Sequence, residues 1–119
     1  MSEPCVTVER LVDEPYVVVT MNRPDPRNAL SRNHLDELIQ VFTDIGPTDV
    51  TGVILTGAGP VFSAGHDFRD LHGAPLEDVR GLIGACSALM LLLGEIPQVV
   101  IARVHGLATA AGCQLVASC

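Results

Sequence analysis

Apolar and polar residues alternate near the start of the chain in a pattern typical of a β-hairpin. Residues 5–11, CVTVERL, alternate, and residues 16–22, YVVVTMN, continue as a β-branched run. Asp13, Glu14 and Pro15 lie between the two runs. Because β-branched runs separated by turn residues favour paired strands, we predict an antiparallel hairpin.

The pattern then changes to a helical period. A proline-rich segment, NRPDPRNALS (22–31), predicts an irregular loop. From Leu35 to Phe42 the apolar residues recur every three or four positions, which indicates one buried helix face. Ser31 is a suitable N-cap, and the helix should end near Gly46.

Two later apolar runs are short and bounded by turn residues, as in strands buried on both faces. They are TGVILTG (51–57) and QVVIARV (98–104). Each run is followed by a loop of small residues, 58–68 and 106–112. A helix is predicted between them, from about Pro75 to Gly94.

A further helix is predicted at 113–119, so the order strand, small-residue loop, helix occurs twice. This order predicts an α/β fold with parallel strands in a single domain, 1–119. In such sheets ligands bind at the carboxyl ends of the strands, where the two small-residue loops lie.

Composition narrows the possible partners and location. The chain has 119 residues, 48% of them hydrophobic, and a net charge of −7 with no lysine. This acidity argues against a nucleic-acid or anionic-membrane surface. The apolar runs are shorter than the roughly 20 residues of a membrane span. The amino terminus lacks the pattern of a signal peptide, so we expect a cytoplasmic protein. The four cysteines show no CxxC spacing, and we expect free thiols.

Standard nucleophile and metal motifs fit poorly. Ser63 lies in VFSAG, which lacks the first glycine of a nucleophile elbow, and we predict a turn hydroxyl that bonds to its own backbone. His66 and His72 fit no common ligand spacing, so we expect solvent-facing loop histidines and no metal. We expect His34 and His105 on a helix surface or at a strand end.

The backbone of the two small-residue loops offers another chemistry. Loops of Gly and Ala expose amide N–H groups to an approaching anion or carbonyl oxygen. Two such loops could each donate one N–H to the same oxygen and so form an oxyanion hole. Alternatively, the small residues serve only to let strand and helix pack closely.

Three segments together carry a family resemblance. NRPDPRNALS (22–31), VILTGAGPVFSAGHDF (53–68) and PQVVIARVHGLATAAGCQLVAS (97–118) resemble, in order and spacing, the enoyl-CoA hydratase/isomerase (crotonase) superfamily. The resemblance implies a spiral of strand-strand-helix units. It also implies an acyl-CoA thioester substrate, with coenzyme A entering as part of the substrate rather than as a cofactor.

The resemblance also implies roles for individual residues. Ser63 to Asp67 look like the S-A-G-A-D motif, and the stretch from Ala111 to Gln114 is similar to G-G-C-E. By this likeness the backbone N–H groups of His66 and Ala111 form the oxyanion hole. The candidates for contacting the substrate or CoA are Arg27, Ala29, Leu30, Ala64, Asp67, Phe68 and Arg69. Arg27 and Arg69 are the candidates for the phosphates, with solvated surface charge as the alternative.

Departures from the family pattern affect the expected chemistry. His66 replaces a small residue, so its imidazole must point away from the acyl group. Ala110 and Ala111 replace glycines, so a positive φ becomes costly there. Gln114 replaces the catalytic glutamate of hydratases, and an amide cannot act as a base near neutral pH.

The family's members are longer, which predicts that this chain is the amino-terminal portion of a crotonase-like domain. On that view the apolar face of the last helix, with Leu115 and Val116, has no later element to cover it. A homotrimer or hexamer is expected when the protein is full length. Three functions remain open: an acyl-CoA enzyme, an acyl-CoA-binding protein without acid–base groups, and an assembly role without a ligand.

Overall fold

A four-stranded mixed sheet organises the molecule. The computed structural model describes residues 4–119 and places the strands in the order β1-β2-β3-β4. The predicted hairpin is confirmed, because β1 (Val6–Arg10) pairs antiparallel with β2 (Tyr16–Met21). The predicted parallel strands are also confirmed: β3 (Gly52–Gly57) pairs with β2, and β4 (Val99–Ala102) pairs with β3.

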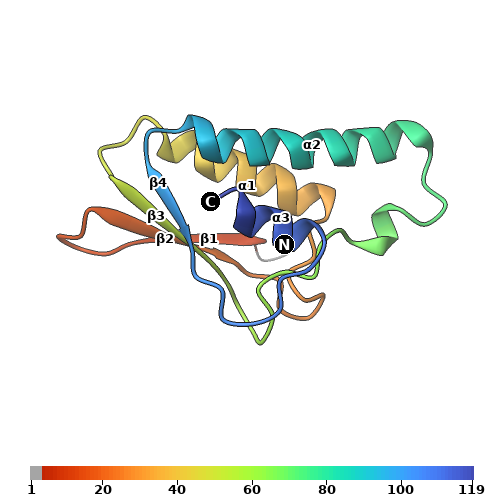
Figure 1. The fold of residues 1–119 in the computed structure, drawn as a ribbon, viewed down its shortest axis with the longest axis horizontal. Coiled ribbons are helices and arrows are strands. Elements are labelled where there is room, and N and C mark those ends of the chain that lie inside the picture. Colours follow the sequence, from red (N-terminus) through yellow and green to blue (C-terminus); the bar gives the residue numbers. More distant parts are fainter. Residues whose placement is uncertain (1–3) are drawn as a thin grey trace.

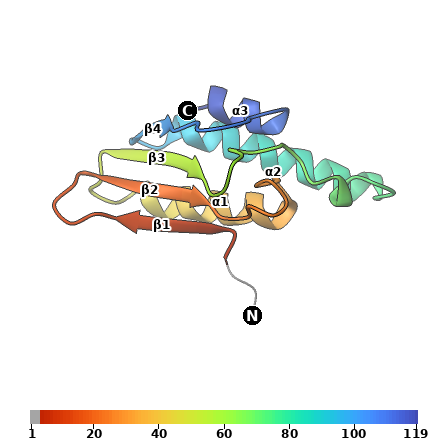
Figure 2. The same cartoon turned by 90° about the horizontal axis from the view of Figure 1, so that it is seen from below.

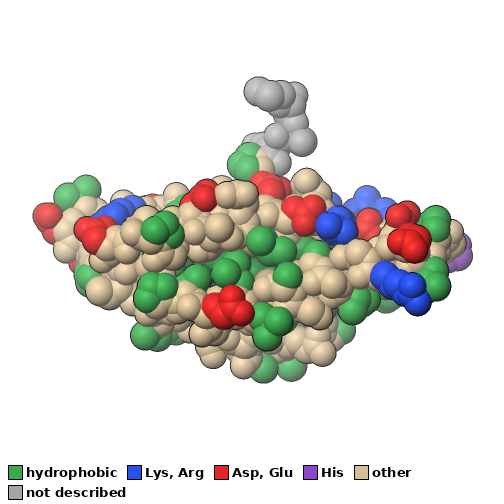
Figure 3. Space-filling model, turned by 90° about the horizontal axis from the view of Figure 1, so that it is seen from above, with side chains coloured by type: hydrophobic (Ala, Val, Ile, Leu, Met, Phe, Trp, Pro, Cys, Tyr) green, Lys and Arg blue, Asp and Glu red, His purple; other side chains and the backbone are tan. Residues whose placement is uncertain are grey.

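Two long helices cover one face of this sheet (Figures 1 and 2). They are α1 (Arg32–Ile45) and α2 (Leu76–Glu95), and they pack against each other. A short 3-10 turn, η1 (Phe68–Asp70), precedes α2. Ser31 caps α1 as predicted, because its Oγ accepts a hydrogen bond of 3.1 Å from the His34 amide. From the helix side, Figure 3 shows apolar side chains in small groups across the surface.

The core lies between the sheet and the helices. The strand register places Val17, Val53 and Val100 in one row across the sheet, and all three are buried. Helix residues such as Leu38 and Phe42 are fully buried in the same cluster. Removing this apolar area from water is the main term that stabilises the arrangement.

The prediction that two strands are buried on both faces is wrong. In β3, Ile54 is only half-buried, and in β4, Val99 is 65% and Ile101 57% exposed. The physical reason is that α1 and α2 cover a single face, while β4 forms one edge of the sheet. A continuous apolar run therefore does not by itself show how many faces are covered.

The last helix, α3 (Ala111–Ala117), begins two residues earlier than predicted and contacts α2. Earlier elements cover part of its apolar face, since Leu115 is fully buried in the core cluster and the half-buried Val116 packs against it. None of the helices formed by residues 4–119 is long and apolar enough to cross a membrane. All four cysteines are free, as predicted.

Candidate functional site

The loops that follow β3 and β4 run alongside each other. We call residues 58–67 the β3 loop and residues 103–110 the β4 loop. The Phe62 amide donates to Leu107 O at 2.9 Å, and the Thr109 amide donates to Ser63 O at 3.1 Å. Ser63 and Ala108 form a parallel bridge between these two hydrogen bonds. The two loops therefore extend the pairing of β3 with β4 beyond the sheet.

Two glycines, Gly65 and Gly112, allow the loops to approach this closely. A β-carbon on Gly112, at the start of α3, would collide with Ser63 O in the β3 loop. Gly65 has φ +91°, and a β-carbon there would lie 3.0 Å from Ala110 Cβ and 3.3 Å from the Ala111 nitrogen. The close packing expected of small residues is thus present, and it brings Gly65 beside the first amide of α3.

Two backbone amides at this contact have no acceptor. The N–H groups of His66 and Ala111 donate no hydrogen bond to any residue in 4–119. Ala111 is the first residue of α3, so its N–H has no partner within the helix. Unpaired amides beside a helix amino terminus favour an oxygen that carries negative charge.

Ala110 adopts a conformation that suits glycine. Its φ is 49° and its ψ is −123°, which an L side chain rarely adopts. The predicted cost of replacing glycine is therefore present at Ala110, at about 1–3 kcal/mol. It is absent at Ala111, which is helical with an ordinary negative φ. The strain lies directly before one of the two unpaired amides.

A pocket of about 590 Å³ is lined in part by the β3 loop. It collects six of the seven predicted contact residues and adds four other residues, one of them His66. The lining residues are Arg23, Asp25, Pro26, Arg27, Ala29, Ala64, His66, Asp67, Phe68 and Arg69. We call it the arginine pocket. Leu30 is fully buried and does not line it.

Asp67 and Arg69 form a tight ion pair within the arginine pocket. Arg69 Nη2 lies 2.6 Å from Asp67 Oδ2, and Arg69 Nε lies 3.0 Å from Oδ1. These hydrogen bonds hold the pKa of the buried Asp67 carboxyl below its usual value. Asp67 is therefore an ionised partner of Arg69 rather than a free base, and Arg69 is oriented by it.

Asn28 is a structural residue that the sequence analysis did not single out. It is fully buried, and its Nδ2 donates to Ala58 O and Val61 O, both at 2.9 Å. Its own φ is 53°, a left-handed value that asparagine tolerates better than most residues. Ser63 Oγ accepts a hydrogen bond of 3.3 Å from the Gly65 amide, which confirms the prediction of a turn hydroxyl bonded to its own backbone. It also donates to Asn28 O at 2.9 Å, a contact 35 positions away that was not predicted.

The histidines differ from their predicted positions in two cases. His34 is wholly buried rather than on a helix surface, and its Nδ1 lies 2.9 Å from Ala29 O. Burial lowers the pKa of His34. His66 is half-buried with Nδ1 inaccessible, not solvent-facing, whereas His72 is exposed as expected. His105 lies in the β4 loop, with Nε2 at 2.6 Å from Gly59 O.

Gln114 lies apart from the arginine pocket. It is exposed on α3 and lines a shallow groove with α2 residues that include Ser87 and Leu91. Three positions separate it from Ala111, so the two residues share one side of α3. The structure thus places the Ala111 amide beside Gly65, which precedes His66, while Gln114 lines a different pocket from His66.

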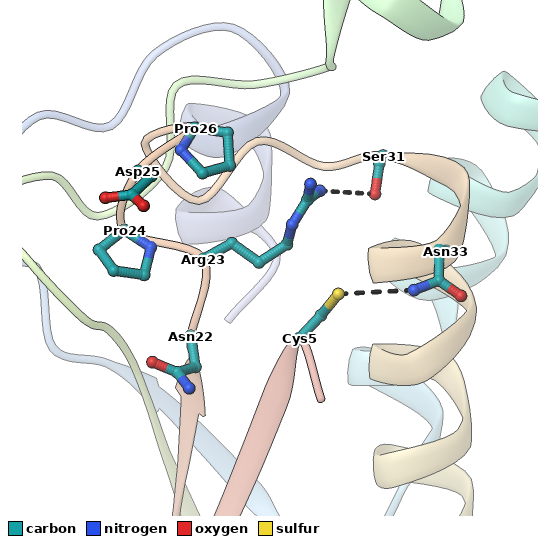
Figure 4. A pocket seen from close by; sticks show the side chains of 8 residues that line it. All are labelled: Cys5, Asn22, Arg23, Pro24, Asp25, Pro26, Ser31 and Asn33. Carbon is teal, nitrogen blue, oxygen red and sulfur yellow. Dashed lines mark hydrogen bonds between the residues drawn. The ribbon is translucent and has the colours of Figure 1, made fainter. Parts of the chain in front are cut away.

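A second pocket, of about 440 Å³, lies between β1, α1 and the loop at 22–26 (Figure 4). Arg23 lines both pockets, and its Nη1 donates to Ser31 Oγ at 2.8 Å. Cys5 Sγ accepts a 3.5 Å hydrogen bond from Asn33. Burial, followed by the nearby Glu37 carboxylate, raises the pKa of the Cys5 thiol. This thiol is thus suited to packing rather than to nucleophilic chemistry.

Comparisons with known proteins agree on one family. The model of the family described as enoyl-CoA hydratase/isomerase matches residues 13–119. Enoyl-CoA hydratase domain-containing protein 3, mitochondrial, from Danio rerio is 46% identical over 85% of this chain and 36% of its own length. The Homo sapiens protein of that name is 42% identical over 99% of this chain and 39% of its own length.

Solved structures agree with the sequence comparisons. An enoyl-CoA hydratase of Mycobacterium smegmatis superimposes with a TM-score of 0.93 at 41% identity, over 98% of this chain and 46% of that chain. Human enoyl-CoA hydratase domain-containing protein 3 superimposes with a TM-score of 0.89 at 36% identity, over 97% of this chain and 46% of that chain. The chain spans less than half the length of these relatives, and its strand-strand-helix arrangement is the crotonase fold. The chain therefore belongs to the enoyl-CoA hydratase/isomerase (crotonase) family.

Proposed function

We propose that this chain binds an acyl-CoA thioester, with the thioester carbonyl oxygen at the backbone N–H groups of His66 and Ala111. The observation that carries this proposal is that both amides are unpaired in two directly hydrogen-bonded loops. Two preorganised donors stabilise the negative charge of an enolate oxygen without reorganising. Removing one such donor from an enzyme typically costs about 3–4 kcal/mol of transition-state stabilisation.

The arginine pocket is the proposed site of the CoA portion. Arg27 and Arg69 line it together with His66, so the pocket adjoins the proposed carbonyl site. Guanidinium groups suit phosphates because they offer several donors in a fixed plane. Asp67 holds one edge of Arg69, and Nη1 of Arg69 makes no hydrogen bond within residues 4–119.

The proposed reaction class is that of the family, in which negative charge develops on the thioester oxygen held by the two amides, as an enolate or, for thioester hydrolysis, as a tetrahedral oxyanion. It covers hydration, double-bond isomerisation and thioester hydrolysis. The second candidate is an acyl-CoA-binding protein without turnover, which Gln114 favours because an amide cannot accept a proton from water. Substituting Gln114→Glu separates the two candidates. If the protein is an enzyme, we expect hydratase turnover to appear or rise in this variant. If it only binds acyl-CoA, we expect the variant to keep its affinity and show no turnover.

Thermal unfolding with and without butyryl-CoA tests the binding proposal. At 100 times its dissociation constant a ligand should stabilise the folded chain by about 2.7 kcal/mol. Arg27→Ala should reduce this stabilisation, and most strongly at low salt, where charges are least screened. Arg10→Ala is the matched control, because Arg10 pairs with Asp49 and does not line the pocket. An unfolding temperature that does not respond to butyryl-CoA would refute the proposal.

Assembly and location belong to the same proposal. We retain a homotrimer or hexamer for the full-length protein, and a cytoplasmic location, as predictions from the sequence. The Danio rerio and Homo sapiens relatives named above are mitochondrial by name. Light scattering of the purified protein tests the assembly. A tagged copy in its own cell tests the location, with mitochondrial staining as the contrary result.

A further inference from the structure

The imidazole of His66 occupies a position between the two parts of the site. Its backbone N–H is one of the two unpaired amides, while its side chain lines the arginine pocket. One residue therefore faces both the proposed carbonyl site and the proposed CoA site. Backbone pairing holds this residue in place. Leu30 and His66 form a parallel β-bridge, and the Leu30 amide donates to Gly65 O at 2.7 Å.

The two ring nitrogens have different surroundings. Nδ1 is buried and has no hydrogen-bond partner among the described residues. Nε2 is not among the buried unpaired atoms and makes no hydrogen bond within residues 4–119, so it is accessible from the pocket. A hydrogen on Nδ1 would be a buried donor without an acceptor, which is costly. With the hydrogen on Nε2 instead, the ring presents that donor to the pocket, and this is the tautomer on which the inference is built.

The position of this donor selects one part of a thioester ligand. The backbone nitrogen and Nε2 belong to one residue, so only a few bonds separate the two donors. In a CoA thioester an ethylene unit separates the sulfur from the first amide of the pantetheine arm, whereas the diphosphate lies at the far end of that arm. A carbonyl oxygen held at the His66 amide thus leaves the first pantetheine amide within the range of Nε2.

We propose that His66 is a specificity-determining residue whose Nε2–H donates a hydrogen bond to the carbonyl of the first pantetheine amide. This inference rests on the proposed thioester site and adds to it a side-chain contact made by a residue that the family pattern would have small. His66 then selects thioesters of N-acylated cysteamine, which include CoA, over simple alkyl thioesters. Arg27 and Arg69 contact the diphosphate independently of it.

Three butyryl thioesters test the proposal: butyryl-CoA, S-butyryl-N-acetylcysteamine, which keeps only the first amide, and S-ethyl butanethioate, which has none. Dissociation constants are measured by NMR titration for the 119-residue chain and its variants. His66→Ala retains the backbone N–H and removes the ring. We expect it to weaken the first two ligands by the same factor, about two- to tenfold, and to leave the third unchanged.

Two further variants keep the test interpretable. His66→Gln retains a side-chain donor and should recover part of the lost affinity. His72→Ala, at an exposed histidine outside the pocket, should change none of the three constants. The inference is overturned if His66→Ala affects butyryl-CoA alone, all three ligands equally, or none. If the wild-type chain binds no thioester, the proposed function fails too, which distinguishes that failure from a failure of the His66 contact alone.

Discussion

The β3 loop and the β4 loop meet at the same site but are held in opposite ways. Buried side chains fix the β3 loop, because Asn28 bonds two of its carbonyls and Ser63 bonds back to Asn28. The β4 loop has side-chain bonds at its edges, through Thr56, His105 and Thr109, but at its contact with the β3 loop it depends on backbone pairing and on the absence of a side chain at Gly112. The first loop should therefore be sensitive to lost side-chain atoms and the second to added ones.

Adding one carbon at the junction should have the largest effect. In Gly112→Ala the new β-carbon collides with Ser63 O, so the two loops must separate. We expect the free energy of unfolding to fall by about 3 kcal/mol in chemical denaturation. Gly84→Ala, in α2 with no atom within 4 Å of the added carbon, should instead raise it by about 1 kcal/mol. Equal stability of the wild type and Gly112→Ala would mean that close contact is not required.

Removing the amide at position 28 should have the next largest effect. Asn28→Gly keeps the left-handed φ of 53° accessible but deletes the hydrogen bonds to Ala58 O and Val61 O. We expect a loss of about 2 kcal/mol, because buried carbonyls lose their donor. Asn28→Ala should lose about 1 kcal/mol more, since alanine disfavours that φ. If Asn28→Gly were as stable as the wild type, side-chain hydrogen bonds would not be what fixes the β3 loop, and the contrast with the β4 loop would fail.

Relieving strain in the β4 loop should stabilise the chain. In Ala110→Gly the φ of 49° becomes unstrained, and we expect the free energy of unfolding to rise by about 1 kcal/mol. The matched control is Ala88→Gly on the exposed side of α2. Its free energy of unfolding should fall by about the same amount, because glycine disfavours a helix interior. A decrease at both positions would show that Ala110 is not strained.

The smallest effect concerns pH and the buried His34 of α1. Burial lowers the pKa of His34 in the folded chain, while the unfolded chain keeps an ordinary value of 6.5. As the pH falls below that value the unfolded state takes up the proton first, so stability decreases. We expect denaturation midpoints to decline from pH 7 to pH 5.5, and His34→Gln to flatten this decline. An unchanged slope in the variant would contradict the assignment.

Local patterns predicted the elements well, for physical reasons. The hairpin and the helix capped by Ser31 depend on neighbours a few positions apart, and both are confirmed. The strain at Ala110 was also predictable, because a family glycine is replaced there. Burial was not, since the exposure of Val99 and the burial of His34 depend on which distant elements pack nearby.

The candidate site was predicted in part. The sequence placed the two amide-bearing loops at the ends of parallel strands, and the structure joins them. It did not reveal that Asn28 holds the β3 loop in place, because the hydrogen bonds of its amide nitrogen reach 30 and 33 positions along the chain. Nor could spacing show that Asp67 binds Arg69 so closely, since side-chain pairing depends on the η1 turn.

The edge position of β4 has a consequence for amide hydrogen exchange. The N–H groups of Val99 and Arg103 donate to β3, so the alternation along the strand turns those of Val100 and Ala102 outward. Outward amides without a strand partner exchange with deuterated water far sooner than their neighbours. Although the Val100 side chain lies in the core, its amide should thus exchange about as quickly as one in a loop. Within β4, a slowly exchanging amide and a deeply buried side chain therefore belong to different residues.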